Sequence, residues 1–354
     1  MDDMKISSPQ KPAVNKFERA ECKGVSVSAE ALIHAECLQP GKTLPLVVQP
    51  ALDGIDLIAW ATNNREFIET HLLKHGGLLF RNFDVKSASE FEQYIRVISG
   101  DLLEYTYRST PRSHVSGHIY TSTEYPADQS IPLHNEMAYS RRWPMKIWFF
   151  CTKSAEQGGE TPIADSRVVF NRINPKIRER FQRKKVMYVR TYGHGLDLPW
   201  QNVFQTESKS KVEDYCRSVG IEVEWKEDNR LKTRHVCQAV AVHPKTGEMV
   251  WFNQAHLFHV SSLKPEIRES LLSMFNEENL PRNVYYADGS PIEASALDEI
   301  REIYQQEAVI FPWRQGDILM LDNMLTAHGR APFAGPRRIV VGMAEPFSSQ
   351  ETYG

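Results

Sequence analysis

The chain has 354 residues, of which 41% are hydrophobic and 25% are charged, and this length allows a large buried core. The net charge of -3 provides no bulk attraction to nucleic acid or to an anionic membrane surface, so neither is expected as a partner. Five cysteines without a CxxC pair argue against a disulfide framework and against a cysteine zinc site.

The N-terminal residues 1–13 are polar and lack the apolar core of a secretory signal. No stretch of the chain approaches the ~20 apolar residues of a membrane-spanning helix. A cytoplasmic protein with reduced thiols is therefore expected.

Residues 1–43 are predicted to form a polar N-terminal arm, because they contain scattered proline and glycine and show no sustained hydrophobic period. Residues 44–354 are expected to form one domain, since no repeat or low-complexity linker divides them. The first elements after the arm are an amphipathic helix over 54–74, a short strand over 78–80, and a helix over 87–99 with Ser89 as its N-cap.

An apolar and aromatic run at 146–151 is typical of a strand buried on both faces. Further helices are predicted over residues 166–172, 175–185, 212–219, 265–275 and 294–306, and further strands over 221–225, 239–242, 249–252, 308–313, 318–321 and 338–343. The strands over 239–242 and 249–252 flank the turn at 244–247 (PKTG) and are expected to form a hairpin. The helices concentrate in two insertions, at about 170–235 and 262–306. Short strands with inserted helices favour a mainly β fold, a double-sheet sandwich or jelly roll; a doubly wound parallel sheet is disfavoured because no phosphate-binding loop is found.

His134 and Glu136 stand two residues apart in a segment that reads as extended, so their side chains are expected on the same face. Such a pair can hold one side of a metal ion, although the pattern alone is common. His328 follows an apolar strand much later in the chain and is expected to add a third ligand from a neighbouring strand. Two histidines and one carboxylate are the set that binds iron(II) and leaves metal positions open for oxygen chemistry.

Arg338 begins the predicted apolar strand over 338–343. An arginine in such a place is costly to bury unless a carboxylate pairs with its planar guanidinium. The partner is either an internal Asp or Glu, or the distal carboxylate of a 2-oxo acid bound to the metal.

These motifs resemble those of the taurine dioxygenase (TauD/TfdA) superfamily of iron(II)- and 2-oxoglutarate-dependent oxygenases. The resemblance covers about residues 45–347 and rests on the ordered set of motifs more than on any one. The superfamily motifs are His134-x-Glu136, residues 158–161 (GGET), and His328 followed by Arg337-Arg338-Ile339. Similarity to the clavaminate synthase-like and SyrP-like branch rests on residues 132–137 (PLHNEM), 158–166 (GGETPIADS), 251–253 (WFN) and 332–338.

The resemblance implies a double-stranded β-helix, the cupin-like jelly roll, with iron at one open end. It implies His134, Glu136 and His328 as the Fe(II) ligands, and Arg338 with Thr161 as the anchor of the 5-carboxylate of 2-oxoglutarate. Dioxygen would be the second cosubstrate. From its own surroundings, Thr161 reads as a turn hydroxyl.

Departures from the family pattern limit the substrate. Taurine dioxygenase has a further arginine for the sulfonate four residues beyond the one that matches Arg338, and Gly342 stands there in this chain, which argues against a sulfonate. Related iron halogenases have a small residue where this chain has Glu136, so halogenation is disfavoured.

The SyrP-like branch implies hydroxylation of an amino acid, free or tethered to a peptide-synthetase carrier domain, in specialised-metabolite and antibiotic biosynthesis. Homo-oligomerisation stays open.

Candidate substrate contacts are polar residues of loops near the predicted ligands: Arg112, Thr121, Ser122, Glu124 and Asn253. Ordinary loop polarity explains each of them equally well. Arg330 and Arg337 read as surface charges or internal salt bridges.

His256 and His259 form a rival metal pair, since they are three residues apart. No carboxylate stands at ligand spacing from them and the flanking residues read as a loop, so a packing or pocket-wall role is favoured.

Other functions remain as alternatives. The same oxidative mechanism can end in desaturation, epoxidation or ring closure. A cupin-like metal hydrolase or isomerase would use the three ligands without Arg338 or Thr161, and a binding module that has kept only the fold would need none of them.

Overall fold

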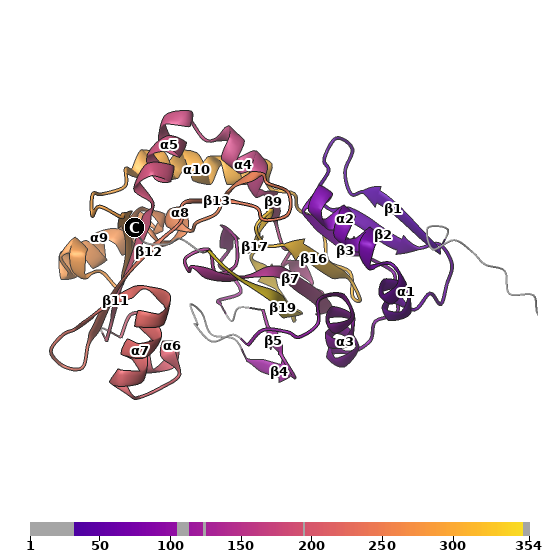
Figure 1. Ribbon diagram of the computed structural model, residues 1–354, viewed down its shortest axis with the longest axis horizontal. Helices are drawn as coiled ribbons and strands as arrows, with labels where there is room; N and C mark the ends of the chain where they lie inside the picture. Colours follow the sequence, from indigo (N-terminus) through magenta and orange to yellow (C-terminus); the bar gives the residue numbers. More distant parts are fainter. Residues whose placement is uncertain (1–31, 105–112, 123–124, 194, 350–354) are drawn as a thin grey trace, which may run out of the picture.

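The computed structural model describes residues 32–104, 113–122, 125–193 and 195–349. Its largest sheet has eight strands in the order β1-β2-β3-β16-β7-β19-β5-β4, and only the β2–β3 pair is parallel (Figure 1). These strands are β1 (Ile33–Cys37), β2 (Leu46–Pro50), β3 (Gly77–Phe80), β16 (Ile318–Asp322), β7 (Arg142–Lys153), β19 (Arg338–Ser348), β5 (Ile119–Thr121) and β4 (His114–Ser116).

Strand β7 lies near the centre of this sheet and contains the apolar run predicted to be a strand. Trp148 and Phe150 point to one face and Ile147 and Phe149 to the other, because strand side chains alternate, and all four are buried. The prediction of a strand buried on both faces is confirmed.

Three helices cover the first face: α1 (Leu57–Asn63), α2 (Arg65–His75) and α3 (Ala88–Ser99). The single helix predicted over 54–74 is divided at Asn64, whose φ of -127° is not helical. Asp56 caps α1 by accepting hydrogen bonds from the amides of Ile58 and Ala59. Helix α3 is capped by Ser87, not by the predicted Ser89, because the Ser87 hydroxyl accepts from the amide of Glu90.

A smaller sheet packs on the other face. It consists of β6 (Ile131–His134), β17 (Thr326–Arg330) and β9 (Ile163–Asp165), and beside it lie the paired strands β8 (Gln157–Gly158) and β18 (Phe333–Ala334). Phe149, Ile163 and Val341 belong to one buried cluster between the two sheets. Two facing, mainly antiparallel sheets are the predicted jelly roll, which is confirmed.

The predicted strand over 308–313 is wrong, since this segment is extended but makes only an isolated bridge between Val309 and Ile163. The predicted polar arm also ends earlier than residue 43. Residues 33–37 pair with 46–50 in antiparallel register, so they belong to the sheet. Residues 1–31 lie outside the described part of the chain.

The two insertions predicted to be helical share a separate four-stranded sheet with the order β11-β12-β10-β15. Its strands are β10 (Val186–Tyr192), β11 (Ile221–Trp225), β12 (Leu231–Cys237) and β15 (Arg282–Tyr286). Because β15 comes from the second insertion and pairs with β10 of the first, the insertions form one structure.

Helices and a hairpin complete the inserted part, which here includes residues 236–261 between the two insertions and lies at the left and top of Figure 1. They are α4 (Ser166–Arg172), α5 (Pro175–Lys184), α6 (Trp200–Phe204), α7 (Lys209–Val219), the hairpin β13 (Val240–Val242) and β14 (Met249–Trp251), α8 (Ala255–Phe258), the 3-10 helix η2 (Val260–Ser262), α9 (Pro265–Met274), the 3-10 helix η3 (Glu277–Asn279), and α10 (Ala294–Glu307). The predicted hairpin and the predicted strand over 221–225 are confirmed.

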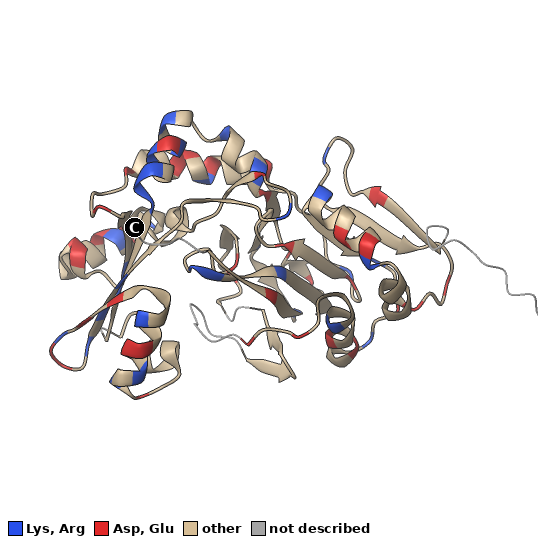
Figure 2. Ribbon diagram, in the orientation of Figure 1, with Lys and Arg blue, Asp and Glu red and all other residues tan. Residues whose placement is uncertain are grey.

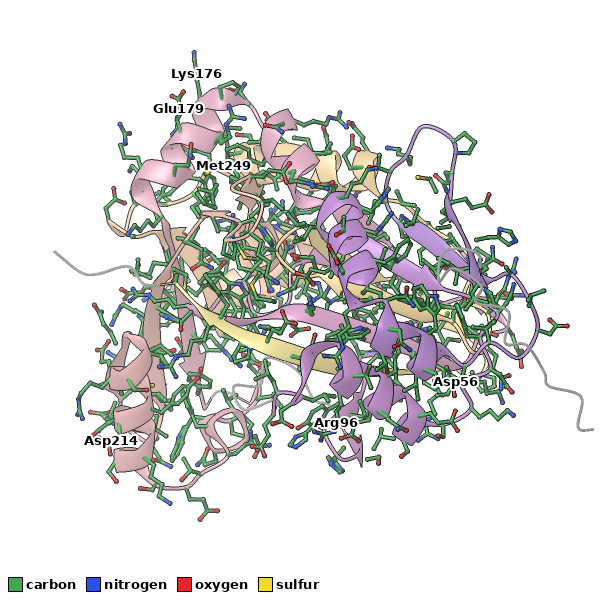
Figure 3. The ribbon with its side chains drawn as sticks, turned by 45° about the vertical axis from the view of Figure 1, so that its right-hand side comes forward. Asp56, Arg96, Lys176, Glu179, Asp214 and Met249 are labelled. Atoms are coloured by element: carbon green, nitrogen blue, oxygen red, sulfur yellow. The ribbon has the colours of Figure 1, made fainter. Side chains whose placement is uncertain are left out.

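Charged residues of both signs occur on the peripheral helices; those of α5 are mainly basic and those of α10 mainly acidic (Figure 2). Lys176 and Glu179 project outward from α5 (Figure 3). Among the described residues, no helix combines the length and the apolar character needed to cross a membrane.

Candidate metal centre and its two cavities

His134, Glu136 and His328 converge on one point. Each offers a ligand atom, and these atoms lie within 4.8 Å of one another. His328 Nε2 and Glu136 Oε2 are 3.8 Å apart, which is too long for a hydrogen bond. The structure thus brings together the three side chains that the sequence singled out.

Two antiparallel strands set the positions of the histidines. His134 ends β6 and stands opposite His328 in β17, so their rings lie on one face with centroids 4.6 Å apart. His328 lies in the middle of β17. Glu136 follows the end of β6, so it reaches the site from a turn and not by simple strand alternation.

Buried amides hold the backbone of this turn. The side-chain oxygen of Asn323 accepts from the amide of Glu136 at 2.7 Å, and its Nδ2 donates to the carbonyl of Glu136 at 2.9 Å. Gln254 donates from Nε2 to the carbonyl of Asn135 at 2.7 Å. Both side chains are at most 2% exposed, so the turn has little freedom and Glu136 is fixed in direction.

The donor set fits iron(II). His134 Nδ1 lies 2.8 Å from the carbonyl of Pro132, which can only accept, so Nδ1 carries the proton and Nε2 is left as a ligand. Two imidazoles and one carboxylate on one side of a metal leave its other positions open.

The rival pair His256 and His259 does not join this cluster. His256 donates from Nε2 to the carbonyl of Leu133 at 2.9 Å, and burial lowers its pKa to about 4. His259 lines the larger cavity described below and accepts from the amide of Ser261. The packing and pocket-wall roles favoured from the sequence agree with these contacts.

A small cavity adjoins His134 and His328 and carries the positive charge of two arginines. Thr161, Arg330 and Arg337 line it together with Ser122 and Phe149. Thr161 is 2% exposed, and its hydroxyl accepts from Trp313 Nε1 at 3.1 Å.

The arginine of this cavity is Arg337, and the expectation for Arg338 has to be corrected. Arg338 is exposed, begins β19 opposite Lys153, and is absent from the lining of the cavity. Arg337 donates from Nε to the carbonyl of Gly159 at 2.8 Å. Neighbouring side chains of a strand point to opposite faces, so only one of the two arginines can turn inward.

Arg337 is half-buried beside a second cation, the buried Arg330. Burial lowers the pKa of its guanidinium to about 10, and the charge of Arg330 lowers it further in the same direction. No Asp or Glu is among the described residues that line this cavity. A bound anion would therefore relieve the cost of burying both charges.

With Arg337 in place of Arg338 as the matching arginine, the position of the family's sulfonate-binding arginine also shifts by one residue. Four residues beyond Arg337 stands Val341, which lines the small cavity, whereas a Cβ on Gly342 would meet Ile95 of α3 at 2.5 Å. Neither residue can bind a sulfonate by charge.

A larger cavity of about 570 Å³ lies on the other side of the ligands and shares His134 with the small one. Glu136 also lines it. Its remaining walls are mainly apolar and come mostly from the inserted part, including Leu198, Phe258 and Ile267. A cavity of this size suits a small organic molecule.

The five candidate substrate residues are separated by the structure. Ser122 lines the small cavity, while Thr121 accepts from the amide of Ser113 and lines neither cavity. Asn253 is buried behind the walls, where it donates to the carbonyl of Ala239. Arg112 and Glu124 lie outside the described residues.

Sequence reasoning missed Arg337, Asn323 and Gln254. The signal for Arg337 was its even spacing from the apolar Ile339 and Val341, which point between the sheets. No local signal distinguished Asn323 and Gln254, because amides of loops are common and only the folded chain brings them to the turn.

Comparisons with known proteins agree with this geometry. The model of the family "Taurine catabolism dioxygenase TauD, TfdA family" matches residues 40–344. The dapdiamide synthesis protein DdaC of Enterobacter agglomerans is 38% identical over 310 residues, which are 84% of this chain and 94% of DdaC. A clavaminate synthase-like protein of Arabidopsis thaliana is 30% identical over 323 residues, covering 86% of this chain and 94% of that protein.

Solved structures share the fold. PvcB of Pseudomonas aeruginosa superimposes with a TM-score of 0.54 at 14% identity, over 91% of this chain and 93% of PvcB. The family match spans the two-histidine, one-carboxylate cluster and both cavities. The chain is therefore a dioxygenase of the TauD/TfdA family, which works with iron(II) and 2-oxoglutarate.

Proposed function

We propose that this enzyme oxidises an unactivated C–H bond of a small amino-acid-like molecule in specialised metabolism. The observation that carries the proposal is the position of His134 between a cationic cavity and a larger apolar one. Two similar proteins support this proposal: DdaC is a dapdiamide synthesis protein, and PvcB is an Fe, alpha-ketoglutarate dependent oxygenase from an isonitrile synthetic pathway.

In this proposal His134, Glu136 and His328 hold iron(II), which with 2-oxoglutarate and dioxygen supplies the oxidising power for C–H cleavage. Arg337 and Thr161 bind the distal carboxylate of 2-oxoglutarate and thereby orient it. The apolar walls of the larger cavity keep water from the reacting bond. One oxygen atom enters succinate, carbon dioxide leaves, and the other oxygen atom becomes the substrate hydroxyl.

Succinate release from 2-oxoglutarate tests the proposal. The iron(II)-loaded enzyme is exposed to air with a panel of free amino acids and aminoacyl carrier domains. At least one of them should stimulate succinate release and gain one oxygen atom. Glu136→Ala should abolish both effects; full turnover by that variant would contradict the ligand assignment.

Product mass separates the other outcomes of the same mechanism. Epoxidation adds one oxygen atom to a substrate that contains a double bond, whereas desaturation and ring closure remove two hydrogen atoms. A metal hydrolase, an isomerase or a binding module would consume no 2-oxoglutarate and would leave Arg337 and Thr161 without a role.

We also propose that the protein works in the cytoplasm. Cys151 and Cys216 are buried thiols outside any disulfide among the described residues, as expected for a reducing compartment.

A further inference from the structure

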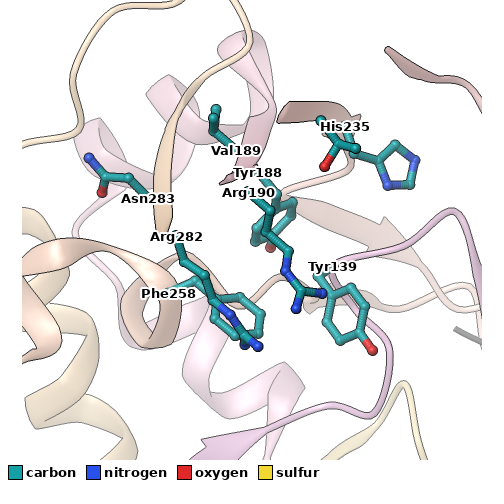
Figure 4. A pocket seen from close by; sticks show the side chains of 9 residues that line it. Tyr139, Tyr188, Val189, Arg190, His235, Phe258, Arg282 and Asn283 are labelled. Carbon is teal, nitrogen blue, oxygen red and sulfur yellow. The ribbon is translucent and has the colours of Figure 1, made fainter. Parts of the chain in front are cut away.

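The larger cavity has one charged wall, which the proposed chemistry does not use. Asp197 and Arg282 line it together with His134 and Glu136. A small adjoining cavity shares Tyr139, Phe258 and Arg282 with the larger one and is also lined by Arg190 (Figure 4). Arg190 and Arg282 belong to the inserted sheet, and Asp197 lies in the segment between β10 and α6.

The two arginines stand opposite each other on neighbouring strands. Arg190 of β10 pairs with Arg282 of β15, so both side chains leave the sheet on one face. Like charges in this position repel, and Asp197 lies between them. It accepts from Arg282 Nε and Nη2, both at 2.6 Å, and from Arg190 Nη2 at 3.0 Å.

Asp197 is fully engaged by these contacts and by the amide of Leu198, which donates to it at 2.7 Å. Burial alone would raise its pKa, but the hydrogen bonds from Arg282 and the charge of Arg190 hold the pKa at about 2. With four hydrogen bonds accepted, the carboxylate has no capacity left for a cationic group of a substrate. Its contribution is to orient the two guanidinium groups.

Among the described residues of this wall, two arginines face one aspartate. The only other acid among the described residues lining these two cavities is Glu136, whose charge the metal would take up. The Arg282 side chain is 24% exposed and that of Arg190 11%, so Arg282 is the more accessible. The Arg282 guanidinium lies 5.4 Å from the centre of the Phe258 ring, which holds it against the cavity (Figure 4).

We propose that Arg282, supported by Arg190 and Asp197, binds a free carboxylate of the substrate, while the rest of the substrate lies along the apolar walls toward His134 and Glu136. The inference rests on the proposed function and narrows its substrate class. A substrate tethered to a carrier domain through its only carboxyl group has lost this charge, so the enzyme should prefer the free acid.

Calorimetric binding tests this assignment. The enzyme loaded with iron(II) and 2-oxoglutarate is titrated without oxygen with the proteinogenic L-amino acids, their N-acetyl derivatives, and the carboxamides of both. At least one acid should bind about tenfold or more tightly than its carboxamide, because a charge-assisted hydrogen bond is lost in the amide. If no acid binds more tightly than its amide, the assignment is overturned, and the contact of Asp197 with Arg282 only attaches the segment after β10 to the inserted sheet.

Substitutions at Arg282 test whether this residue causes the preference for the acid over its carboxamide. Arg282→Gln should bring the acid down to the affinity of the amide, and Arg282→Lys should keep part of the difference. Arg217→Gln is the matched control, since Arg217 is an exposed arginine of α7 paired with Asp214. An Arg282→Gln enzyme that keeps the full preference for the acid would refute the assignment. If this variant does not fold, the comparison of acid with amide in the unaltered enzyme still tests the assignment.

Succinate release keeps the two proposals apart. A preference for acids without any coupled succinate release would refute the proposed oxidation and leave the carboxylate site. Equal stimulation of succinate release by acids and amides would refute the carboxylate site and leave the oxidation.

Discussion

At the scale of single residues, the pair Arg337-Arg338 shows that two adjacent identical side chains take opposite orientations at the start of a strand. Arg337 points between the sheets with Ile339 and Val341, whereas Arg338 points to water. A register shift in the pairing with β7 lies between Arg338 and Ile339. Composition alone offers no way to rank the two arginines, because they are identical and adjacent.

This choice leads to a prediction about the cosubstrate. Arg337→Gln should weaken binding of 2-oxoglutarate by roughly 30-fold or more, equal to about 2 kcal/mol, because a buried carboxylate would lose its charged partner. Anaerobic titration of the iron(II)-loaded protein with 2-oxoglutarate measures it. Arg338→Gln is the matched control and should change the affinity by less than about threefold. The reverse order of effects would restore Arg338 as the anchor.

At the scale of elements, the turn after β6 depends on residues that are distant in the chain. Asn323, between β16 and β17, holds Glu136 by two hydrogen bonds, and Gln254 of the segment before α8 holds Asn135. His256 holds the carbonyl of Leu133 from the first turn of α8. The ligand segment is therefore positioned by three elements and not by its own strand.

Asn323→Ala should both destabilise the fold and weaken iron binding. The loss of buried hydrogen bonds should lower the free energy of unfolding by roughly 2–3 kcal/mol. Iron(II) affinity, measured by competition with a chelator, should fall because Glu136 is released.

Asn283→Ala is the control for this variant, since Asn283 is also buried and its side chain accepts from the amide of Val260 and donates to Glu277, away from the ligands. It should lower stability to a similar degree and leave iron affinity unchanged. If both variants bind iron as the unaltered protein does, Asn323 has no positioning role.

At the scale of the whole molecule, the jelly roll and the inserted part contribute different parts of the site. The jelly roll contributes His134, Glu136 and His328 and the small cationic cavity. The inserted part contributes most walls of the larger cavity, including Phe258 and Arg282. Substrate preference should therefore change with the inserted part while the metal centre stays the same.

The inserted sheet also makes global stability depend on pH. Burial, together with the charge of Arg141, lowers the pKa of His235 in β12 to about 4, from 6.5. The unfolded chain binds the proton more tightly, so this contribution is complete above pH 6.5 and is lost as the pH falls toward 4.

Urea unfolding at pH 7 and pH 5 should show a loss of about 2 kcal/mol from His235 alone. In His235→Phe that part of the pH dependence should be absent. An identical loss in the variant would show that His235 is not buried as a neutral ring.

The sequence by itself determined the local patterns and the pieces of the metal centre. Strand 146–151 and the hairpin followed from periodicity and turn chemistry, which depend on neighbours in the chain. The jelly roll was indicated by the short strands with inserted helices and by the resemblance, which rests on an ordered set of motifs that includes His134, Glu136 and His328. Helix caps were less secure, as Ser87 and Ser89 show, because both are good caps and packing selects one.

Only the tertiary structure decided which arginine faces the small cavity, that the two insertions share a sheet, and that Asp197 lies between Arg190 and Arg282. Each of these results depends on pairing between residues distant in the chain. Register and burial are set by the packing of the whole molecule, so no local period of the sequence can express them.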